Sequence, residues 1–282
     1  MNAHGAAVQR VAAVELTEGA GVRVRRTLGT PALRHLDPFL LLDHLAGTGP
    51  EDYLAGFPDH PHRGFVTVTY LLAGHVEHRD SLGNRGDLRA GGVQWMKAAG
   101  GVIHSEMPQP TDGRLEGFQL WVNLPAANKM DAPAYQDFPA DAVPEFERPG
   151  VRGRLVAGPL GARRGPVRDP FTDLRFLHLA LEPGAGFAWS VPEGYHAFVY
   201  VFDGAATVAG TAVGRDTLAV PDPGGQVDLA AGGEGAALLA IAGRPLGEPI
   251  VQYGPFVMNT REQVEQALAD YRAGRLVRPR PG

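Results

Sequence analysis

The chain has 282 residues, 44% hydrophobic and 20% charged, a composition typical of a globular protein with one large or two ordinary domains. Its net charge of −5 gives no electrostatic reason to bind nucleic acid, and no apolar run reaches the roughly 18 residues of a membrane span, so we expect neither partner. The absence of cysteine excludes disulfides, thiolate ligands and cysteine nucleophiles, and without a signal-like pattern in residues 1–14 the expected location is cytoplasmic.

The first predicted elements are two strands. Residues 22–28 (VRVRRTL) alternate apolar and basic residues, which predicts a half-exposed strand; we interpret its arginines as a solvated face rather than a phosphate site. Residues 36–45 (LDPFLLLDHL) form a buried run that ends in Asp43 and His44. Because a buried polar pair is costly unless it is hydrogen-bonded, we expect both side chains to have partners.

Two short segments carry the chemistry, His60-Pro61-His62 and His104-Ser105-Glu106. On an extended strand, residues i and i+2 point to the same face, so each segment can aim two side chains at one point. If the two strands are neighbours, three imidazoles and one carboxylate converge on a single divalent cation. Such a set leaves about two coordination positions for water, substrate or dioxygen, which indicates a working site more than a structural one.

The segments between and after these pairs are predicted to be strands and turns. Residues 67–74 (TVTYLLAG) read as a core strand that ends in a turn, and residues 83–92 as a glycine-rich turn before a strand at 93–96. Residues 118–124 (FQLWVNL) predict a strand with Gln119 and Trp121 on one face. Two interpretations of Gln119 stay open, a hydrogen-bond donor to a metal ligand or an ordinary strand residue.

The second half repeats the pattern of the first without its histidine pairs. Aligning the closing glycines sets residues 67–74 beside 197–204 (AFVYVFDG), and Ser190 and Pro192 then match His60 and His62. His178 and His196 are isolated, so we interpret them as hydrogen-bonded core or rim residues. The second half is therefore expected to be a duplicated domain without metal.

The chain ends in a predicted amphipathic helix over residues 260–273. Thr260 and Gln263 form a capping-box pattern, and Gly274 follows where a helix would stop. Apolar residues recur at helical spacing, at Val264, Ala267, Leu268 and Tyr271.

Several stretches together resemble the pirin family of the cupin superfamily. These are HPHRGF with TVTYLLAG (60–74), HRDSLGNRG (78–86), GVQWMKAAGGVIHSEMP (92–108), GFQLWVNLPAANKM (117–130) and GEPIVQYGPFVMNT (247–260). Val66 departs from the general cupin pattern, which has glutamate there, but that position is not a metal ligand in pirins. The resemblance also places His75, His78 and Asp80 at a strand end and turn, outside the metal shell. It leaves open whether Asp43 and His44 support the metal site or only make structural hydrogen bonds.

The expected fold is all-β, with two antiparallel cupin (jelly-roll) β-barrels and a C-terminal amphipathic helix. Residues 1–138 are predicted to form the N-terminal metal-binding cupin domain. Residues 139–282 are predicted to form a degenerate C-terminal cupin domain without metal, which includes helix 260–273.

The resemblance implies a quercetin 2,3-dioxygenase that opens a flavonol with O2. The metal ligands would be His60, His62, His104 and Glu106, and Glu106 would also act catalytically by accepting the flavonol hydroxyl proton. Fe(II) fits best, although Mn, Ni, Cu or Zn could take the same ligands. Gln119, Trp95 and Met107 are candidate cavity-lining or supporting residues.

Two other functions stay open. One is an iron-binding, redox-sensitive regulator that acts through protein partners, for which Arg63 and Lys97 are the nearest basic residues. The other is a metal-dependent isomerase or storage cupin with an unrelated small substrate.

Overall fold

The computed structural model describes residues 8–110 and 113–277, which form two compact units of interleaved segments. Unit 1 contains residues 8–14, 27–38 and 143–245; unit 2 contains residues 15–26, 39–142 and 246–277. The predicted domains divide the chain once, at 138/139, close to the change of unit at 142/143. In the compact units, however, the C-terminal helix belongs with residues 39–142, because its buried face packs within unit 2.

Unit 2 contains a seven-stranded antiparallel sheet with the largely buried strand β6 near the middle. All residues of β6 from Phe65 to Leu71 are buried, as expected for a core strand. In β3, Val22 and Val24 are buried and Arg23 is exposed, so the predicted alternation is confirmed. In order across the sheet the strands are β12 (Ala134–Phe138), β9 (Val93–Lys97), β6 (Phe65–Ala73), β11 (Leu115–Asn123), β4 (Phe39–Gly47), β3 (Val22–Arg26) and β2 (Val14–Glu18).

The second sheet of unit 2 has four strands, in the order β5 (Phe57–His62), β10 (Val102–Pro108), β7 (His75–Asp80) and β8 (Arg85–Arg89). Strand β8 lies where a turn was predicted, so that prediction is wrong. Its Gly86 serves close packing, because a Cβ there would lie 2.0 Å from Tyr135 Oη and 2.5 Å from Gln94 Nε2. The turn itself is shorter, and Asp80 accepts hydrogen bonds from the backbone amides of Leu82 and Asn84.

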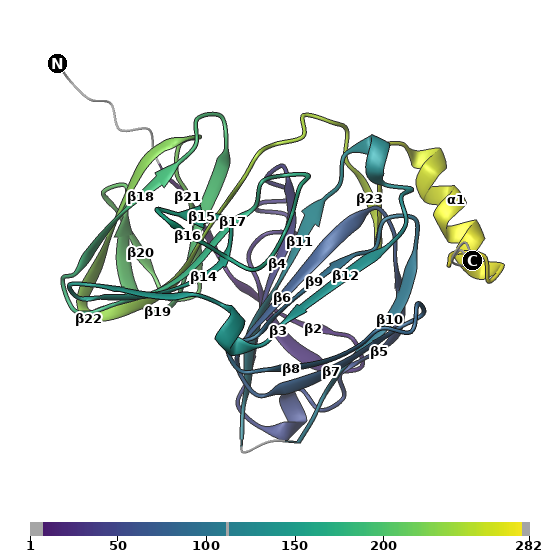
Figure 1. Cartoon of the computed structure of the whole chain (residues 1–282), viewed down its shortest axis with the longest axis horizontal. Helices are drawn as coiled ribbons and strands as arrows, with labels where there is room; N and C mark the ends of the chain where they lie inside the picture. The colour runs from purple at the N-terminus through teal and green to yellow at the C-terminus, as the bar shows by residue number, and fades with distance from the viewer. Residues whose placement is uncertain (1–7, 111–112, 278–282) are drawn as a thin grey trace. The chain divides into compact units, whose positions relative to one another are not determined.

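The two sheets of unit 2 pack face to face. Figure 1 shows β5, β7 and β8 along one side of this unit, and β6, β9 and β11 along the other. A hydrophobic cluster joins them: Leu45, Leu71 and Leu115 come from the seven-stranded sheet, and Val76 and Leu88 from the four-stranded sheet. Burial of these side chains holds the sheets together and leaves the space beside β5 and β10 for polar groups.

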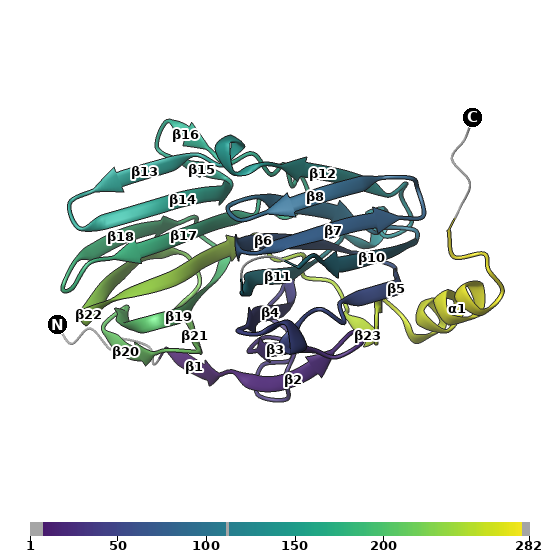
Figure 2. The same cartoon turned by 90° about the horizontal axis from the view of Figure 1, so that it is seen from below.

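The C-terminal segment of unit 2 consists of the hairpin β23 (Val251–Tyr253) and β24 (Phe256–Met258), followed by α1 (Arg261–Arg272). The predicted helix is confirmed, with Thr260 Oγ1 accepting from the Gln263 amide and the Thr260 amide donating to Gln263 Oε1. Helix α1 lies beside β23 (Figure 2). Its Ala267 is fully buried against Phe256. No helix in the described ranges is long and apolar enough to cross a membrane.

Unit 1 contains one nine-stranded sheet built around two long strands, β19 (His196–Val208) and β22 (Gly225–Gly243). Register shifts after Val201 and Gly204 interrupt the pairing of β19 with β22. The second half of β22 pairs with β17 and its first half with β18, so the sheet folds back over its own interior. The other strands are β1 (Gln9–Ala12), β21 (Thr217–Val220), β17 (Arg175–Leu181), β14 (Val151–Ala157), β13 (Glu145–Arg148), β18 (Gly186–Val191) and β20 (Thr211–Gly214).

Short elements complete the two units. A two-stranded ribbon pairs β15 (Pro159–Leu160) with β16 (Arg163–Arg164). The 3-10 turns are η1 (Pro50–Asp52), η2 (Ala126–Asn128) and η3 (Ala140–Ala142).

Candidate metal centre

Three histidines meet where β5 and β10 run side by side. The antiparallel register sets His104 opposite His60, and Val102 opposite His62. The ring centroids are 4.3 Å apart for His60 and His104, 4.9 Å for His62 and His104, and 4.7 Å for His60 and His62. One ring nitrogen of each lies within 4.8 Å of the others. The structure thus brings these three predicted residues together in a geometry that one metal ion could bridge.

Glu106 follows on the same strand and is held by two side chains from the facing sheet. Thr69 Oγ1 donates to Oε1 at 3.2 Å, and Gln119 Nε2 donates to Oε2 at 2.8 Å. Trp121 Nε1 lies 3.0 Å from Gln119 Oε1. Because an indole nitrogen can only donate, the Gln119 oxygen must face Trp121 and its NH2 group must face Glu106. Of the two interpretations of Gln119, the structure favours the hydrogen-bond donor.

His78 also lies in this cluster, although the family resemblance placed it at a strand end and turn outside the metal shell. It belongs to strand β7, directly beside β10, and is opposite Glu106 in register. His78, His104 and Glu106 have ligand atoms within 4.8 Å of one another, and His78 is 1% exposed. The spacing of His78 and Asp80, two residues apart as in the two recognised pairs, was the signal that could have revealed it.

Two of the buried histidines, His62 and His104, are held in their neutral form. Burial lowers the pKa of His62 well below its ordinary value, the nearby His60 lowers it further, and the Pro255 carbonyl opposes the change. The pKa of His104 is also well below its ordinary value, first through burial and then through His62, His60 and His78. Neutral imidazole is the form that binds a metal ion.

Four buried ring nitrogens at the centre have no hydrogen-bond partner within the described residues: both nitrogens of His62, Nε2 of His78 and Nε2 of His104. Two of them, His62 Nε2 and His104 Nε2, belong to predicted metal ligands. Leaving a buried polar atom unpaired costs about 1–3 kcal/mol, so such atoms call for an explanation. A divalent cation would supply the missing partner for both nitrogens, and the residues present therefore fit a metal ion.

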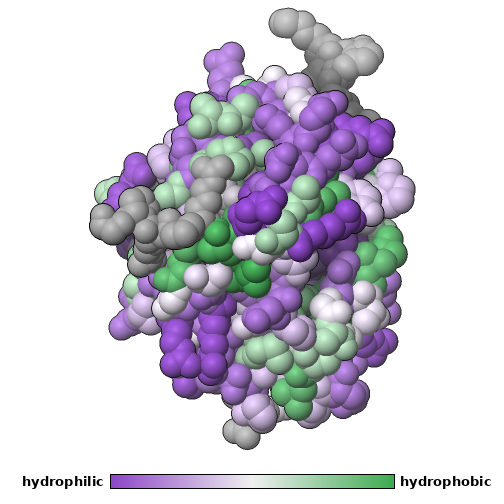
Figure 3. Space-filling model, turned by 90° about the vertical axis from the view of Figure 1, so that its right-hand side faces the viewer, coloured by the Kyte–Doolittle hydropathy of each residue, from purple (hydrophilic) through white to green (hydrophobic). Residues whose placement is uncertain are grey.

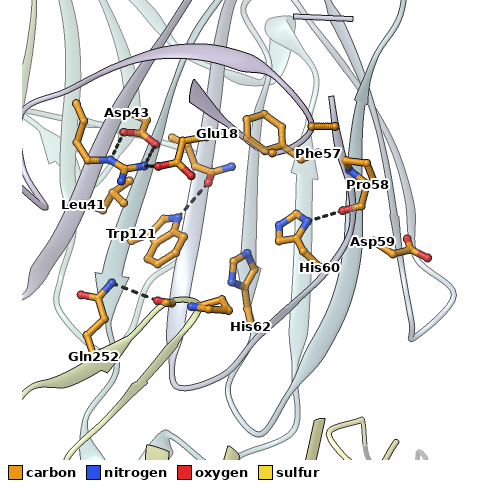
Figure 4. A pocket seen from close by; sticks show the side chains of 16 residues that line it. Glu18, Leu41, Asp43, Phe57, Pro58, Asp59, His60, His62, Trp121 and Gln252 are labelled. Carbon is orange, nitrogen blue, oxygen red and sulfur yellow. Dashed lines mark hydrogen bonds and ion pairs between the residues drawn. The ribbon is translucent and has the colours of Figure 1, made fainter. Parts of the chain in front are cut away.

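A cavity of about 550 Å³ opens beside His60 and His62. Figure 4 shows the two histidines on one side of the cavity and the Asp43–Glu18 cluster on the other, with Trp121 also in the wall. Arg26 connects the two carboxylates, through hydrogen bonds of 2.7 and 2.6 Å to Asp43 and an ion pair of 2.8 Å to Glu18. The full lining is Glu18, Gly19, Ala20, Arg26, Leu41, Asp43, Phe57, Pro58, Asp59, His60, His62, Gln119, Trp121, Gln252, Gly254 and Pro255.

The cavity corrects the interpretation of Arg26 and separates the candidates for its lining. Arg26 does not belong to a solvated strand face, because its guanidinium is paired with Asp43 and Glu18 at the cavity wall. Trp95 and Met107 do not line this cavity, because Trp95 is buried in β9 and the Met107 side chain packs near Gly56. Of the three residues considered as cavity-lining or supporting, only Gln119 is part of the wall.

Comparison with known proteins shows the family. Residues 21–122 match the family model described as Pirin, and residues 176–277 match the one described as Pirin C-terminal cupin domain. The chain belongs to the pirin family. Human pirin is 39% identical to it over 264 residues, which cover 92% of this chain and 89% of human pirin. A Pseudomonas aeruginosa protein named as a candidate quercetin 2,3-dioxygenase is 48% identical over 266 residues, which cover 92% of this chain and 93% of that protein.

The fold of this pirin family member matches solved structures. The crystal structure of quercetin 2,3-dioxygenase from Acinetobacter baumannii superposes with a TM-score of 0.88 at 35% identity, and covers 95% of this chain and 96% of that one. The predicted fold class is therefore confirmed, with two cupin domains of antiparallel strands and one C-terminal helix. The names of the relatives include both quercetin 2,3-dioxygenase and pirin.

The basic residues considered for a partner surface in this pirin family member are not free on its surface. Arg63 is 2% exposed; its Nε donates to the Gly100 carbonyl at 2.7 Å, and its Nη1 donates to Asp270 Oδ2 at 2.8 Å. Lys97 is half-buried, with its Nζ 3.6 Å from Asp131 Oδ2. Neither residue therefore offers an exposed basic group for a partner, and Arg63 instead fastens α1 to the strand that carries His60 and His62.

Proposed function

We propose that this pirin family member is a metal-dependent dioxygenase that opens a flavonol such as quercetin with O2. His60, His62, His104 and Glu106 would hold one divalent metal ion, with Fe(II) the best fit. The observation that carries the proposal is the meeting of three imidazoles, two of them buried and neutral, beside a hydrogen-bonded carboxylate, with His60 and His62 in the wall of a cavity. The names of relatives at 48% and 35% identity support the reaction class.

The donor set suits a redox-active ion. Three nitrogens and one carboxylate oxygen leave about two positions open in an octahedral shell, a pattern related to non-haem iron sites. Mn, Ni, Cu or Zn can occupy the same ligands, since affinity order does not favour iron. When bound, the metal would supply Lewis acidity toward the flavonol oxygens and, for iron, one-electron chemistry with dioxygen.

The cavity suits a planar, hydroxylated aromatic substrate. Its volume of about 550 Å³ lies in the usual range for small-molecule sites. Leu41, Phe57 and Trp121 offer apolar surface for the rings of a flavonol. Glu18 and the Arg26–Asp43 pair provide polar groups on the side away from the histidines, where ring hydroxyls could hydrogen-bond.

Glu106 is the group proposed to move a proton. Its carboxylate would accept the proton of the flavonol 3-hydroxyl, which leaves the substrate as an electron-rich anion. Thr69 and Gln119 hold the two carboxylate oxygens by donated hydrogen bonds, which fixes the direction in which Glu106 faces. The overall reaction balances as flavonol plus O2 giving a ring-opened ester plus carbon monoxide.

The test is oxygen uptake by anaerobically purified, Fe(II)-reconstituted protein with quercetin, with a His62→Ala variant beside it. We expect oxygen consumption matched by the loss of flavonol absorbance, and neither in the variant. Full iron loading with no turnover would contradict the dioxygenase proposal and direct attention to the regulatory alternative.

A role through protein partners has no specific contact in its favour within the described residues. Arg63, one of its two basic candidates, is buried. On the face that carries α1, hydrophobic residues occur in small groups between hydrophilic ones (Figure 3). Such scattered exposure is ordinary for a protein surface and does not identify a partner site.

A further inference from the structure

A second buried pair, His78 and Asp80, lies directly behind the candidate metal centre. Both side chains point to the interior face of β7, with 2% and 1% of their side-chain surfaces exposed. In the β7–β10 register Asp80 is opposite His104, and His78 is opposite Glu106. The Nδ1 atoms of His78 and His104 are 3.4 Å apart, and His78 Nε2 is 3.7 Å from Asp80 Oδ2.

The positions of the protons on His104 and His78 follow from the choice of His104 Nε2 as the nitrogen that faces the metal ion. If His104 Nε2 offers its lone pair to a cation, the neutral ring must carry its proton on Nδ1. That proton points to His78 Nδ1, which can accept it only when His78 is protonated on Nε2. The Nε2–H of His78 then faces the Asp80 carboxylate, an electrostatic contact at 3.7 Å. One arrangement of protons therefore gives His104 Nδ1 an acceptor on His78 and turns the Nε2–H of His78 toward the Asp80 carboxylate.

Both members of the pair are fixed from outside the centre. Asp80 accepts hydrogen bonds from the Leu82 amide at 2.9 Å, the Asn84 amide at 3.0 Å and Asn84 Nδ2 at 2.7 Å. The His78 ring is stacked on Tyr135 at 4.8 Å, with 27° between the planes. Neither side chain is free to turn, so each can hold the next one in place.

We propose that His78 is a positioning residue for His104. It accepts the Nδ1 proton of His104, which sets the tautomer and the ring plane that present Nε2 to the metal ion, and Asp80 fixes His78 in the accepting form. This inference rests on the proposed metal site. Hydrogen-bond partners of ligating histidines usually contribute a factor of about 10–100 in metal affinity. His78 contributes through this hydrogen bond, without coordinating the ion.

The experiment compares two substitutions of His78 with a matched control on the same strand. His78→Leu removes the acceptor, whereas His78→Asn can place an amide oxygen near the position of Nδ1. The control is His75→Leu, because His75 is also on β7 and also contacts an aspartate, Asp87, but is not part of the histidine cluster. The readouts are the dissociation constant for Co(II) and the intensity of its d–d absorption, which reports the coordination number.

We expect His78→Leu to bind Co(II) about 10–100-fold more weakly than the wild type, with an unchanged absorption intensity. His78→Asn should recover most of the affinity, and His75→Leu should bind like the wild type. Melting temperatures of the metal-free proteins show whether each variant is folded. If His78→Leu unfolds the protein, the affinity of His78→Asn decides: wild-type-like binding supports the proposal, and a loss as large as about 100-fold overturns it.

The other outcomes separate this inference from the proposed function. Unchanged Co(II) affinity in a folded His78→Leu variant overturns the positioning role alone. A change of coordination number in both His78 variants also overturns it, because His78 would then be a ligand itself. A wild-type protein that binds no metal overturns the proposed function, and the positioning role with it.

Discussion

The two units use the same order of strands to build opposite kinds of interior. In unit 2 the order is β9-β6-β11-β4, and in unit 1 it is β21-β19-β22-β17, with the buried Tyr70 and Tyr200 in the corresponding strands β6 and β19. Facing these strands, unit 2 places the histidine cluster on β5 and β10. Unit 1 places Phe187, Trp189 and Val191 of β18 in its core.

The difference shows that this architecture separates stability from chemistry. The interior of unit 1 is closed by large apolar side chains, whose burial contributes about 1.5–3 kcal/mol each. Unit 2 leaves a cavity lined in part by His60 and His62, and it buries the neutral imidazoles of His62 and His104 and the carboxylate of Glu106. Changes in unit 1 should therefore act on folding, and changes at the centre of unit 2 on metal and turnover.

The largest expected effect is the loss of bound metal after a substitution at the centre of unit 2, compared with no loss after a substitution in unit 1. His104→Ala should reduce bound metal from about one equivalent to nearly none and lower flavonol turnover by at least about 100-fold, because a ligand contributes more than its hydrogen-bond partners do. His178→Ala, on β17 of unit 1, should leave both unchanged. Metal analysis and oxygen uptake provide the measurements. Loss of cooperative unfolding in His104→Ala would instead indicate a structural metal.

The second prediction concerns a substitution in unit 1 that should lower stability and leave metal binding unchanged. Trp189→Ala should destabilise unit 1 by about 3–5 kcal/mol, because it leaves a large cavity in an apolar core. Urea unfolding measures the loss, and metal content per folded chain should stay the same. A fall in metal content of the folded variant would contradict the separation of roles.

The third prediction concerns Lys129, a fully buried amine of unit 2. Its Nζ donates to the carbonyl oxygens of Gly64 and Val257 and to Asn123 Oδ1, and burial lowers its pKa to about 7, partly opposed by Glu248. An unfolded lysine has a pKa of about 10.4, so between about pH 7 and 10 the unfolded state binds more protons. Stability contributed at this position should rise with pH in that window, by up to about 1.4 kcal/mol per pH unit.

Unfolding of the wild type and Lys129→Met across this pH range provides the measurement for Lys129. The variant should lose this rise with pH, although its overall stability also falls because three acceptors lose their partner. Lys97→Met, a half-buried lysine of the same unit, is the matched control and should keep the wild-type slope. Equal slopes in the wild type and Lys129→Met would show that Lys129 stays protonated when buried.

The smallest effect is expected where α1 joins the strand of the histidines. Asp270→Asn removes the negative charge facing Arg63 but keeps an oxygen acceptor, so the loss should be about 1 kcal/mol. Glu265→Gln, which breaks the exposed pair with Arg261 on the same helix, should change stability by less than about 0.5 kcal/mol. Thermal unfolding measures both. If Glu265→Gln lowered stability more than Asp270→Asn, the role of Arg63 in fastening α1 would be contradicted.

The repeat between the two halves was visible in the sequence, but its alignment did not identify the interior positions of unit 1. The alignment set Ser190 and Pro192 against His60 and His62, whereas the buried residues of β18 are Phe187, Trp189 and Val191. A shift of one residue moves a side chain to the other face of a strand. The alignment indicated which segment corresponds to residues 60–62, and only the pairing of β18 with β22 defined which of its residues face inward.

The sequence by itself determined the features that depend on local spacing. The helix at 261–272 followed from its capping box and apolar stripe, and the common direction of the side chains within each pair, His60 with His62 and His104 with Glu106, followed from their spacing on extended strands. Only the tertiary structure decided which strands are neighbours. It brought His78 of β7 against His104, Thr69 and Gln119 of the facing sheet against Glu106, and Asp270 of α1 against Arg63. These contacts join residues far apart in the chain, and their partners are set by the packing of sheets rather than by any local pattern.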